Sequence, residues 1–493
     1  MIAAAVLPIV VLTAKVVVAV LLSRAAWTWW WNRKSCPGAD IPGDMGWPLI
    51  GDTVKFFFLQ DPRTYLREMH AKHGPVFKSH ILGRPSVFLC DNADIKKCLL
   101  GEDRVVIQHM FTPMRILTGE HSLLSQHGEE HFENRSMILR ALRPDALQSM
   151  IPLLQNKVQD ALDGWIRQGG KVDVYEHLRH WTFAMAQTIV LGEYSDELNK
   201  VVFKPFHTLD LGTMSLPINL PWTQFGKAMA AKDFLNGILG DLILEREAEY
   251  LKRDADDVFP GLLGSCLARR REKGISGNRD LIKSICQLQL GVGAASSTTT
   301  AGCVLTLNGL ARHPELQEVL YAEQLEVFGD GPLPPLELAH FKNMPKLDSA
   351  IREMLRQQPT AMLVPRLAIK SFEAHTGNVV PNAWAVWLSL DTAMTQTGRF
   401  DAIDEFLPMR YLKDSPDSLK PQPFEDRLFG GGQRMCPGKE LALMELKVIV
   451  TLFIHYTTFG YPAGEEVHVI DNPTPAPAPD TPMALVLTPR RRP

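Results

Sequence analysis

The sequence predicts a mainly α-helical protein with a minor β-sheet, an α+β arrangement. Apolar residues recur with helical spacing over most of residues 90–355, whereas two short runs rich in β-branched and aromatic residues, at 76–81 and 86–89, flank a Gly/Pro turn. No internal repeat interrupts this pattern, and a hydrophobic content of 45% over 493 residues is enough for a sizeable core. One large, mostly helical globular domain is therefore expected.

Charge and cysteine content narrow the functional classes. The formal net charge of −3 gives no reason to expect a nucleic-acid partner. The 7 cysteines are odd in number and show no C-x-x-C spacing, which favours reduced thiols over a disulfide framework. The bulk of the chain is therefore expected in a reducing compartment.

The N-terminal stretch has the composition of a membrane anchor. Apolar residues dominate from Ile2 to Leu22, about the 20 residues that a helix needs to cross a bilayer, although Lys15 lies among them. Tryptophans and basic residues gather at the end of this run: Arg24, Trp27, Trp29, Trp30, Trp31, Arg33 and Lys34. Positive charge after the span predicts a single-pass anchor with the rest of the chain in the cytosol. A cleaved secretory peptide is the alternative.

These observations divide the chain into three parts. Residues 1–24 are the predicted anchor, and residues 25–52 are an aromatic and proline-rich hinge, since Pro37, Pro42 and Pro48 stand among glycines and exclude a helix there. Residues 53–493 form the predicted globular domain.

Within that domain the elements follow from local signals. Helices are expected at Pro62–His73, from about His131 to Leu142, at Asp280–Arg312 and around Glu353. The runs at 76–81 and 86–89 predict a hairpin, and further strands are expected at 367–369, 378–381, 385–387 and 484–487.

The centre of the long helix is unusual. Gly291–Thr300 is a run of small and hydroxylated residues, which are poor helix formers, so local unwinding or a bulge is expected there. Close helix packing through small residues would explain the glycines but not the hydroxyls.

One cysteine stands where a thiolate is favoured. Cys436 lies at the start of an apolar, helix-periodic run, where it meets unpaired N–H groups and the positive end of a helix. We therefore expect an anionic sulfur. Glycines in Phe429–Glu440 permit tight turns, and Gly438 leaves room for a large flat group beside the backbone. Thiolate ligation of haem iron needs these features; a buried structural cysteine beside a Gly-rich turn is the alternative.

The spacing Phe-x-x-Gly-x-Arg-x-Cys-x-Gly, from Phe429 to Gly438, resembles the cytochrome P-450 family, and the resemblance extends from about Pro37 to the C-terminus. It implies that family's fold behind a membrane anchor helix, haem b with Cys436 as the thiolate ligand, and residues 53–493 as the catalytic domain. By the same resemblance, four basic residues would hold the haem propionates: Arg434, Arg366, Arg135 and His131.

The family's oxygen-side pattern, Ala-Gly-x-acid-Thr-Thr, falls on Ala294–Thr299 when counted back from Pro314. The sequence departs from it, because Ser297 stands at the position of the acid and Ala295 at that of the glycine. In the family the acid and the threonine help bring protons to dioxygen. Thr298 is therefore the candidate oxygen-side hydroxyl, and Ser297 can relay a proton but supplies no charge.

The resemblance also implies a buried network and an electron donor. Glu353, Arg356 and Arg410 match the family's structural Glu-Arg-Arg set. The chain shows no flavin or dinucleotide fingerprint, so electrons are expected from NADPH-cytochrome P-450 reductase of the endoplasmic reticulum membrane. Lys439 and Arg427 are the expected contacts with that acidic partner.

The substrate is indicated only by class. The C-P-G-K-E-L-A segment and residues 45–52 resemble the branch that holds plant steroid and terpenoid oxidases and animal retinoid hydroxylases. A lipophilic isoprenoid (steroid, triterpenoid or diterpenoid) oxidised with O2 is therefore expected. Two alternatives stay open: a reductase-independent haem-thiolate isomerase or dehydratase, suggested by Ser297, and a membrane haem protein that binds a lipid without catalysis.

Overall fold

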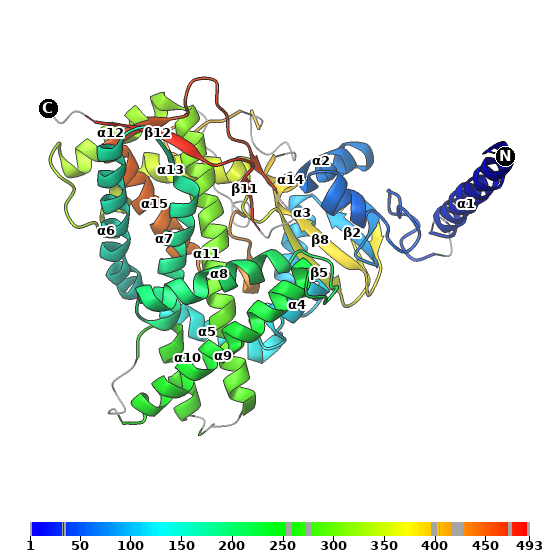
Figure 1. Ribbon diagram of the computed structural model, residues 1–493, viewed down its shortest axis with the longest axis horizontal. Coiled ribbons are helices and arrows are strands. Elements are labelled where there is room, and N and C mark those ends of the chain that lie inside the picture. Colours follow the sequence, from blue (N-terminus) through cyan, green and yellow to red (C-terminus); the bar gives the residue numbers. More distant parts are fainter. Residues whose placement is uncertain are drawn as a thin grey trace. The chain divides into compact units, whose positions relative to one another are not determined.

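The computed structural model describes residues 2–31, 33, 36–252, 259–272, 274, 278–395, 402–403, 405–415, 427–471 and 476–490. They form two compact units, the first of residues 1–109 and 363–393 and the second of residues 110–362 and 394–493. Helices dominate and the sheets are small, which confirms the predicted fold class (Figure 1).

The first unit is built on a five-stranded sheet in the order β1-β2-β8-β5-β3. Its strands are β1 (Val76–Ile81), β2 (Arg84–Leu89), β3 (Val106–Gln108), β5 (Leu363–Ala368) and β8 (Ala385–Ser389), with the pair β6 (Phe372–Glu373) and β7 (Val379–Val380) beside them in sequence. Its helices are α1 (Ile2–Trp31), the π-helical turn η1 (Lys55–Leu59), α2 (Pro62–His73) and α3 (Asn92–Leu100). The predicted hairpin is confirmed, since β1 pairs antiparallel with β2.

Helix α1 continues beyond the predicted end of the anchor at residue 24, because no proline or glycine occurs between residue 24 and Pro37. Its last turns pack against the first unit. The ring centroid of Trp27 lies 5.6 Å from that of His80, and the ring centroid of Trp31 lies 5.8 Å from that of Trp384. Two of the four predicted interfacial tryptophans are therefore packing residues.

The predicted hinge, residues 25–52, is helical over residues 25–31, which belong to α1, whereas its residues from Cys36 on are largely irregular and lie against strand β1. The Lys78 N–H donates to the Pro42 carbonyl at 2.7 Å. Gly51 has a φ of +57°, and a Cβ there would lie 1.9 Å from the His80 carbonyl oxygen. Only glycine fits this close approach of two backbones.

The second unit is a helical body with small sheets. Its helices are α4 (Thr112–Thr118), α5 (Gly128–Ala141), α6 (Pro144–Gln168), α7 (Val174–Leu191), α8 (Asp196–Gly212), α9 (Gln224–Tyr250), α10 (Gly261–Glu272), α11 (Asn278–Arg312), α12 (Pro314–Phe328), α13 (Pro345–Gln357), α14 (Leu390–Thr395, whose first residues belong to the first unit) and α15 (Lys439–Tyr456), with short 3-10 turns η2 (His340–Asn343) and η3 (Gly432–Arg434). Its strands are β4 (Lys171–Asp173), β9 (Thr457–Gly460) and β12 (Ala484–Pro489) in one sheet, and β10 (Val469–Ile470) and β11 (Ala478–Pro479) in another.

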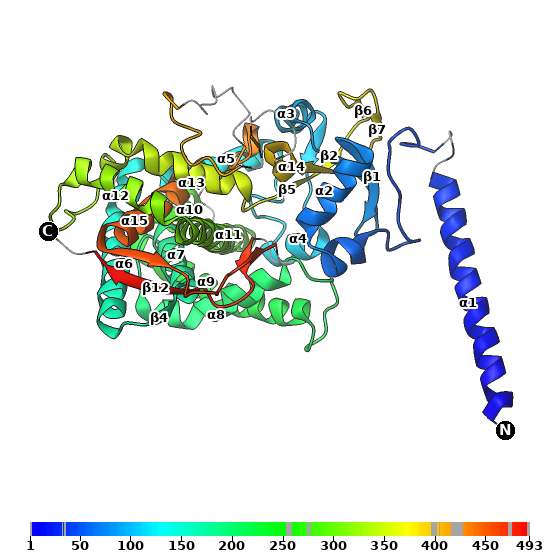
Figure 2. The same ribbon diagram turned by 90° about the horizontal axis from the view of Figure 1, so that it is seen from above.

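Helix α11 runs through the middle of this unit. It packs against α7, α9, α13 and α15. Figure 2 shows α11 with other helices of the unit around it. The core cluster of the unit draws on the same helices. The side chains of α11 are therefore placed by several elements at once.

The predicted unwinding at Gly291–Thr300 is wrong, because α11 is regular α-helix from end to end. Its hydroxyl groups do not compete with the helix, since they bond to carbonyls that the helix already presents. Thr298 Oγ1 donates to the Ala294 carbonyl at 2.8 Å, and Thr300 Oγ1 donates to the Ser296 carbonyl at 2.9 Å.

Among the described residues, one helix, Asp280–Arg312, is long and apolar enough to cross a membrane, and 56% of its apolar stretch is buried inside the protein. This is the core helix α11, and core helices of soluble proteins can be equally long and apolar. The predicted anchor at residues 1–24 coincides with α1, but its side chains before residue 15 lie outside the described residues.

The Glu353 network forms within the second unit. Arg356 Nε donates to Glu353 Oε2 at 2.8 Å, and Arg410 Nε lies 3.2 Å from both carboxylate oxygens. The three side chains are at most 1% exposed. The same carboxylate also accepts from the Leu407 N–H at 3.0 Å, so it ties helix α13 to the segment before the cysteine loop.

Candidate haem site

The loop before α15 turns back on itself to present the sulfur of Cys436. The Cys436 N–H donates to the Phe429 carbonyl at 2.9 Å and closes the loop. Gly430 and Gly432 adopt φ values of +73° and +65°, which side-chain-bearing residues disfavour. A Cβ at Gly438 would lie 3.9 Å from the sulfur, an ordinary van der Waals contact, so the sulfur itself would tolerate a side chain there.

Burial raises the pKa of the Cys436 thiol, whereas the backbone N–H of Gly438 and the charge of Arg135 lower it. Burial has the largest effect of the three and favours the neutral thiol, so the expected anionic sulfur stays a prediction. The two opposing groups still favour a sulfur that carries negative charge. Coordination to the haem iron would supply further stabilisation of the thiolate, because a ligating thiol is deprotonated on binding.

Arg434 ties the cysteine loop to the segment that precedes α5. Its guanidinium donates to the Leu123 carbonyl at 3.1 Å and to the Gln126 carbonyl at 2.5 Å, and it lies 3.2 Å from His127 Nδ1. The structure therefore brings Arg434 and Cys436 together with the helix that carries His131 and Arg135.

Helix α5 presents the other two basic residues of the second unit. His131 is buried at 3% exposure. Arg135 is half-buried, its pKa is lowered by burial, and the negative charge of the Cys436 thiolate opposes that effect. Arg135 has no carboxylate or hydrogen-bond partner among the described residues. A partly buried guanidinium near the cysteine, without a carboxylate partner among the described residues, fits the carboxylate of a haem propionate.

Arg366 lies on β5 in the first unit, where its Nε is 2.8 Å from Glu102 Oε2. Both side chains are at most 1% exposed. Glu102 also accepts from the Gln108 N–H at 2.8 Å, so this pair fixes β3 against β5. The predicted propionate role of Arg366 stays a prediction.

Ser297 and Thr298 lie on α11, and a contact that the sequence did not indicate involves the first of them. Ser297 Oγ donates to Asp210 Oδ2 at 2.6 Å. Burial raises the pKa of Asp210 to about 6, although the Ser297 hydroxyl and the Arg179 charge lower it. Local sequence offered one signal: an acid between Leu209 and Leu211 in the apolar last turns of α8.

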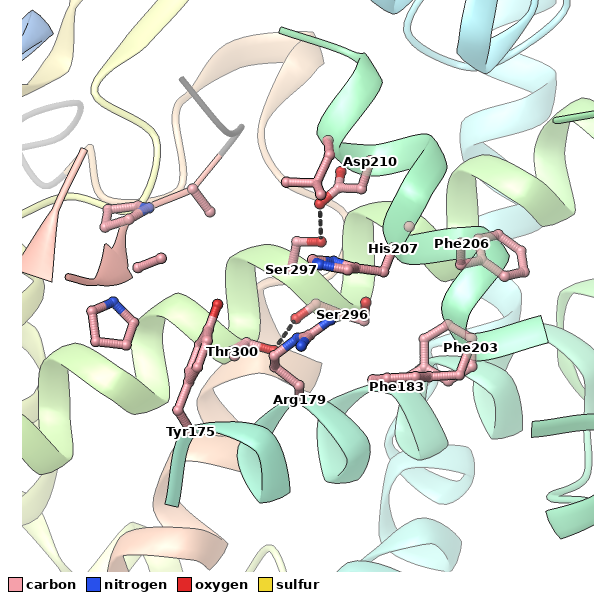
Figure 3. Close-up of a pocket in the computed structure, with 16 residues that line it drawn as sticks. Tyr175, Arg179, Phe183, Phe203, Phe206, His207, Asp210, Ser296, Ser297 and Thr300 are labelled. Carbon is pink, nitrogen blue, oxygen red and sulfur yellow. Dashed lines mark hydrogen bonds between the residues drawn. The ribbon is translucent and has the colours of Figure 1, made fainter. Parts of the chain in front are cut away.

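A cavity of about 280 Å³ opens beside this hydrogen bond, between α7, α8, α11 and residues 476–479. In Figure 3, Tyr175 and Arg179 extend from α7, and His207 and Asp210 extend from α8 toward Ser297. Three phenylalanines, Phe183, Phe203 and Phe206, make the other end apolar. The cavity therefore has a polar part that contains Asp210 and an apolar part.

The predicted docking role of Arg427 is wrong, because its side chain is buried at 1% exposure. Lys439 is partly exposed, and its ammonium group lies 6.0 Å from the centroid of the Phe429 ring.

Comparisons with known proteins point to the same family as the spacing of the cysteine loop. A sequence model of a family described as "Cytochrome P450" matches residues 41–485. Abscisic acid 8'-hydroxylase 1 of Arabidopsis thaliana is 28% identical over 430 residues, 85% of each chain. Taxane 10-beta-hydroxylase of Taxus cuspidata is 28% identical over 454 residues, 91% of this chain and 90% of the relative. A solved structure of cyanobacterial CYP120A1 with bound retinoic acid matches with a TM-score of 0.81 and 27% identity, covering 91% of this chain and 99% of that chain.

Proposed function

This chain belongs to the cytochrome P450 family and is a haem-thiolate monooxygenase, and from that premise we propose that it oxidises a lipophilic isoprenoid at a membrane. Its haem is held through a cysteine thiolate, as in the family. Bound there, the thiolate-ligated haem supplies activation of dioxygen and attack on unactivated C–H bonds.

The residues of this chain then have distinct roles in the proposal. Cys436 holds the iron, and Gly438 donates its N–H to the sulfur. Arg135 and Arg434 orient the propionates, with His131 on the same helix as Arg135. The half-buried guanidinium of Arg135, which has no carboxylate partner among the described residues, is the observation that carries this assignment.

The substrate class rests on the relatives and on the apolar lining of the molecule. The names of the relatives mention abscisic acid and a taxane, and the solved structure contains retinoic acid. All three molecules have isoprenoid skeletons. The proposed substrate is therefore a steroid, a triterpenoid or a diterpenoid, with the apolar residues of α8 and its following loop among its contacts.

The cellular setting follows from the N-terminal sequence. The apolar run from Ile2 to Leu22, followed by Arg24 and Arg33, supports a single-pass anchor in the endoplasmic reticulum membrane with the catalytic domain in the cytosol. NADPH-cytochrome P-450 reductase of that membrane is the proposed electron donor.

The absorption spectrum of the reduced carbon-monoxide complex tests the ligand assignment. We expect the haem-thiolate spectrum in the wild type and its loss in Cys436→Ser. An unchanged spectrum in the variant would contradict the assignment of Cys436. Isoprenoids that shift the ferric haem from low to high spin are then the candidates for turnover with reductase and NADPH.

The reductase-independent alternative rests on the missing acid at Ser297. The structure gives less reason for this alternative, because the Ser297 hydroxyl donates a hydrogen bond to the Asp210 carboxylate. Product formation in the absence of NADPH and reductase would restore it.

A further inference from the structure

We propose that Asp210 of α8 is the proton-exchanging carboxyl group that serves Ser297 of α11, and that the cavity beside it supplies the water that exchanges protons with both. The inference rests on the oxygenation reaction described above, which consumes protons. Asp210 acts through Ser297, so it is a positioning and proton-supplying residue.

The geometry starts from one short hydrogen bond between two helices. Ser297 Oγ lies 2.6 Å from Asp210 Oδ2, a distance typical of a hydroxyl that donates to a carboxylate. The two residues are 87 positions apart in sequence, and the bond joins the last turns of α8 to the centre of α11. The α11 helix therefore gains from another helix the carboxyl group that its own sequence lacks.

The charged and titratable groups that face Asp210 come from α7 and α8. Arg179 of α7 acts on Asp210 electrostatically, but its Nη1 is also 2.6 Å from Glu176, which shares its charge. Tyr175 of α7 lines the same cavity. His207 of α8 is the remaining group, and burial lowers its pKa to about 4, so it is neutral near pH 7.

Burial raises the pKa of Asp210 to about 6, close to the pH at which a cytosolic enzyme works. A proton donor is most effective when its pKa lies near the working pH, because both of its protonation states are then populated. An exposed aspartate, with its ordinary pKa of 3.8, would hold almost no protons under the same conditions.

The cavity has room for the water that this exchange needs. One buried water occupies about 10–15 Å³ on the same measure, and the cavity measures about 280 Å³. Tyr175, His207 and Thr300 offer polar atoms along it, as Figure 3 shows. Several waters fit between these groups and the Asp210 carboxyl.

The proton transfer balances without any further reagent. When Asp210 is ionised, the Ser297 hydroxyl donates to it. After Asp210 takes a proton that the cavity waters relay from a hydronium ion of the bulk solvent, which is left as water, the carboxyl O–H donates to Ser297 Oγ, and the hydroxyl proton of Ser297 becomes available for the oxygenation reaction. As that proton leaves, Ser297 takes the carboxyl proton, and the starting state returns with one proton moved.

The test uses the full-length, haem-loaded protein and four variants: Asp210→Asn, Ser297→Ala, the exchange Ser297→Asp with Asp210→Ser, and Asp210→Glu. We expect Asp210→Asn and Ser297→Ala to release more hydrogen peroxide than the wild type. The amount of product formed per NADPH should fall at least about tenfold, which is less than the rate effect that general acid–base groups typically have. The exchange variant keeps one carboxyl group at the same hydrogen bond and should recover most of the coupling. Asp210→Glu should also retain it.

Two further measurements separate this role from a structural one. The wild-type pH profile of coupling should fall as the pH rises through about 6, and Asp210→Asn should abolish that dependence. Asp241→Asn, an exposed aspartate on α9, is the matched control and should leave the profile unchanged.

Infrared spectroscopy of the protein without substrate or reductase provides the second readout. A carboxylic C=O band that titrates near pH 6 should be present in the wild type and absent in Asp210→Asn. This band does not depend on the substrate, so it distinguishes failure of the inference from failure of the proposed isoprenoid function. Unchanged coupling and pH profile in Asp210→Asn, or a titrating band that survives the substitution, would overturn the proposal.

Discussion

Arg135 is a partly buried cation in the neighbourhood of the cysteine loop. Its guanidinium is half-buried, senses the charge of the Cys436 sulfur and has no carboxylate partner among the described residues. A hydrogen bond to a charged group contributes about 1.5–3 kcal/mol, so Arg135→Gln should weaken haem binding about 10- to 100-fold. The ratio of haem to protein after dilution or competition with apomyoglobin measures this loss.

A control on the same helix makes that result specific. Arg140 is exposed on α5, and Arg140→Gln should bind haem as the wild type does. Equal haem retention in Arg135→Gln and Arg140→Gln would contradict the propionate role of Arg135.

Asp210 also makes a prediction about stability. Its pKa in the folded protein is about 6, above the ordinary value of 3.8, so the folded state binds the proton more tightly than the unfolded state. Its contribution to stability is therefore fully present below about pH 4 and is lost as the pH rises through 6. The loss amounts to at most roughly 3 kcal/mol from this group.

Denaturant unfolding at several pH values measures this contribution. The difference in unfolding free energy between Asp210→Asn and the wild type should shift in favour of the variant as the pH rises from 4.5 to 7. A difference that stays constant over this range would show that Asp210 titrates as an exposed carboxyl.

At the scale of elements, the Glu353 network holds helix α13 against the segment that precedes the cysteine loop. Both Arg356 and Arg410 are buried and share this carboxylate. Glu353→Ala would leave two buried guanidinium groups without it, and breaking a buried ion pair costs about 3–5 kcal/mol. We expect a lower denaturation midpoint and faster loss of haem on heating.

Glu326→Ala provides the comparison, because that glutamate is exposed on the neighbouring helix α12. It should change the unfolding free energy by less than about 0.5 kcal/mol. Similar stabilities of the two variants would contradict the importance of the network.

Helix ends were predictable where the local chemistry decides them. Helix α2 begins at Pro62 because the Asp61 side chain accepts from the Thr64 N–H at 2.9 Å, and it ends where Gly74 adopts a φ of +84°. Both signals stand in the sequence. The haem ligand was predictable for the same reason, since the spacing around Cys436 is local.

Contacts between distant segments were not predictable in this way. The centre of α11 was expected to unwind, but packing on several sides and bonds to its own carbonyls keep it regular. The partner of Ser297 lies on another helix, and no pattern within α11 indicates it. Arg427 was expected at the surface but is buried, and the sequence around it does not indicate the distant residues that cover it.

At the scale of the molecule, we propose different roles for two parts of the N-terminal helix. Its first part carries the apolar run of the proposed anchor, and its last turns pack on the first unit through Trp27 and Trp31. The predicted boundary at residue 24 falls between these parts. A truncation that respects this boundary should therefore separate membrane attachment from folding.

Deletion of residues 2–22 should release the protein from membranes and leave its unfolding free energy unchanged, because both tryptophans remain. Deletion of residues 2–33 removes Trp31, which is 8% exposed in the core cluster, together with the contact of Trp27 to His80. Loss of a buried tryptophan costs about 3–5 kcal/mol, so the longer deletion should unfold at a lower temperature. Membrane flotation and thermal melting measure the two effects. Trp31→Ala in the shorter deletion should reproduce most of the loss; if both truncations melted alike, the last turns of α1 would contribute to the anchor alone.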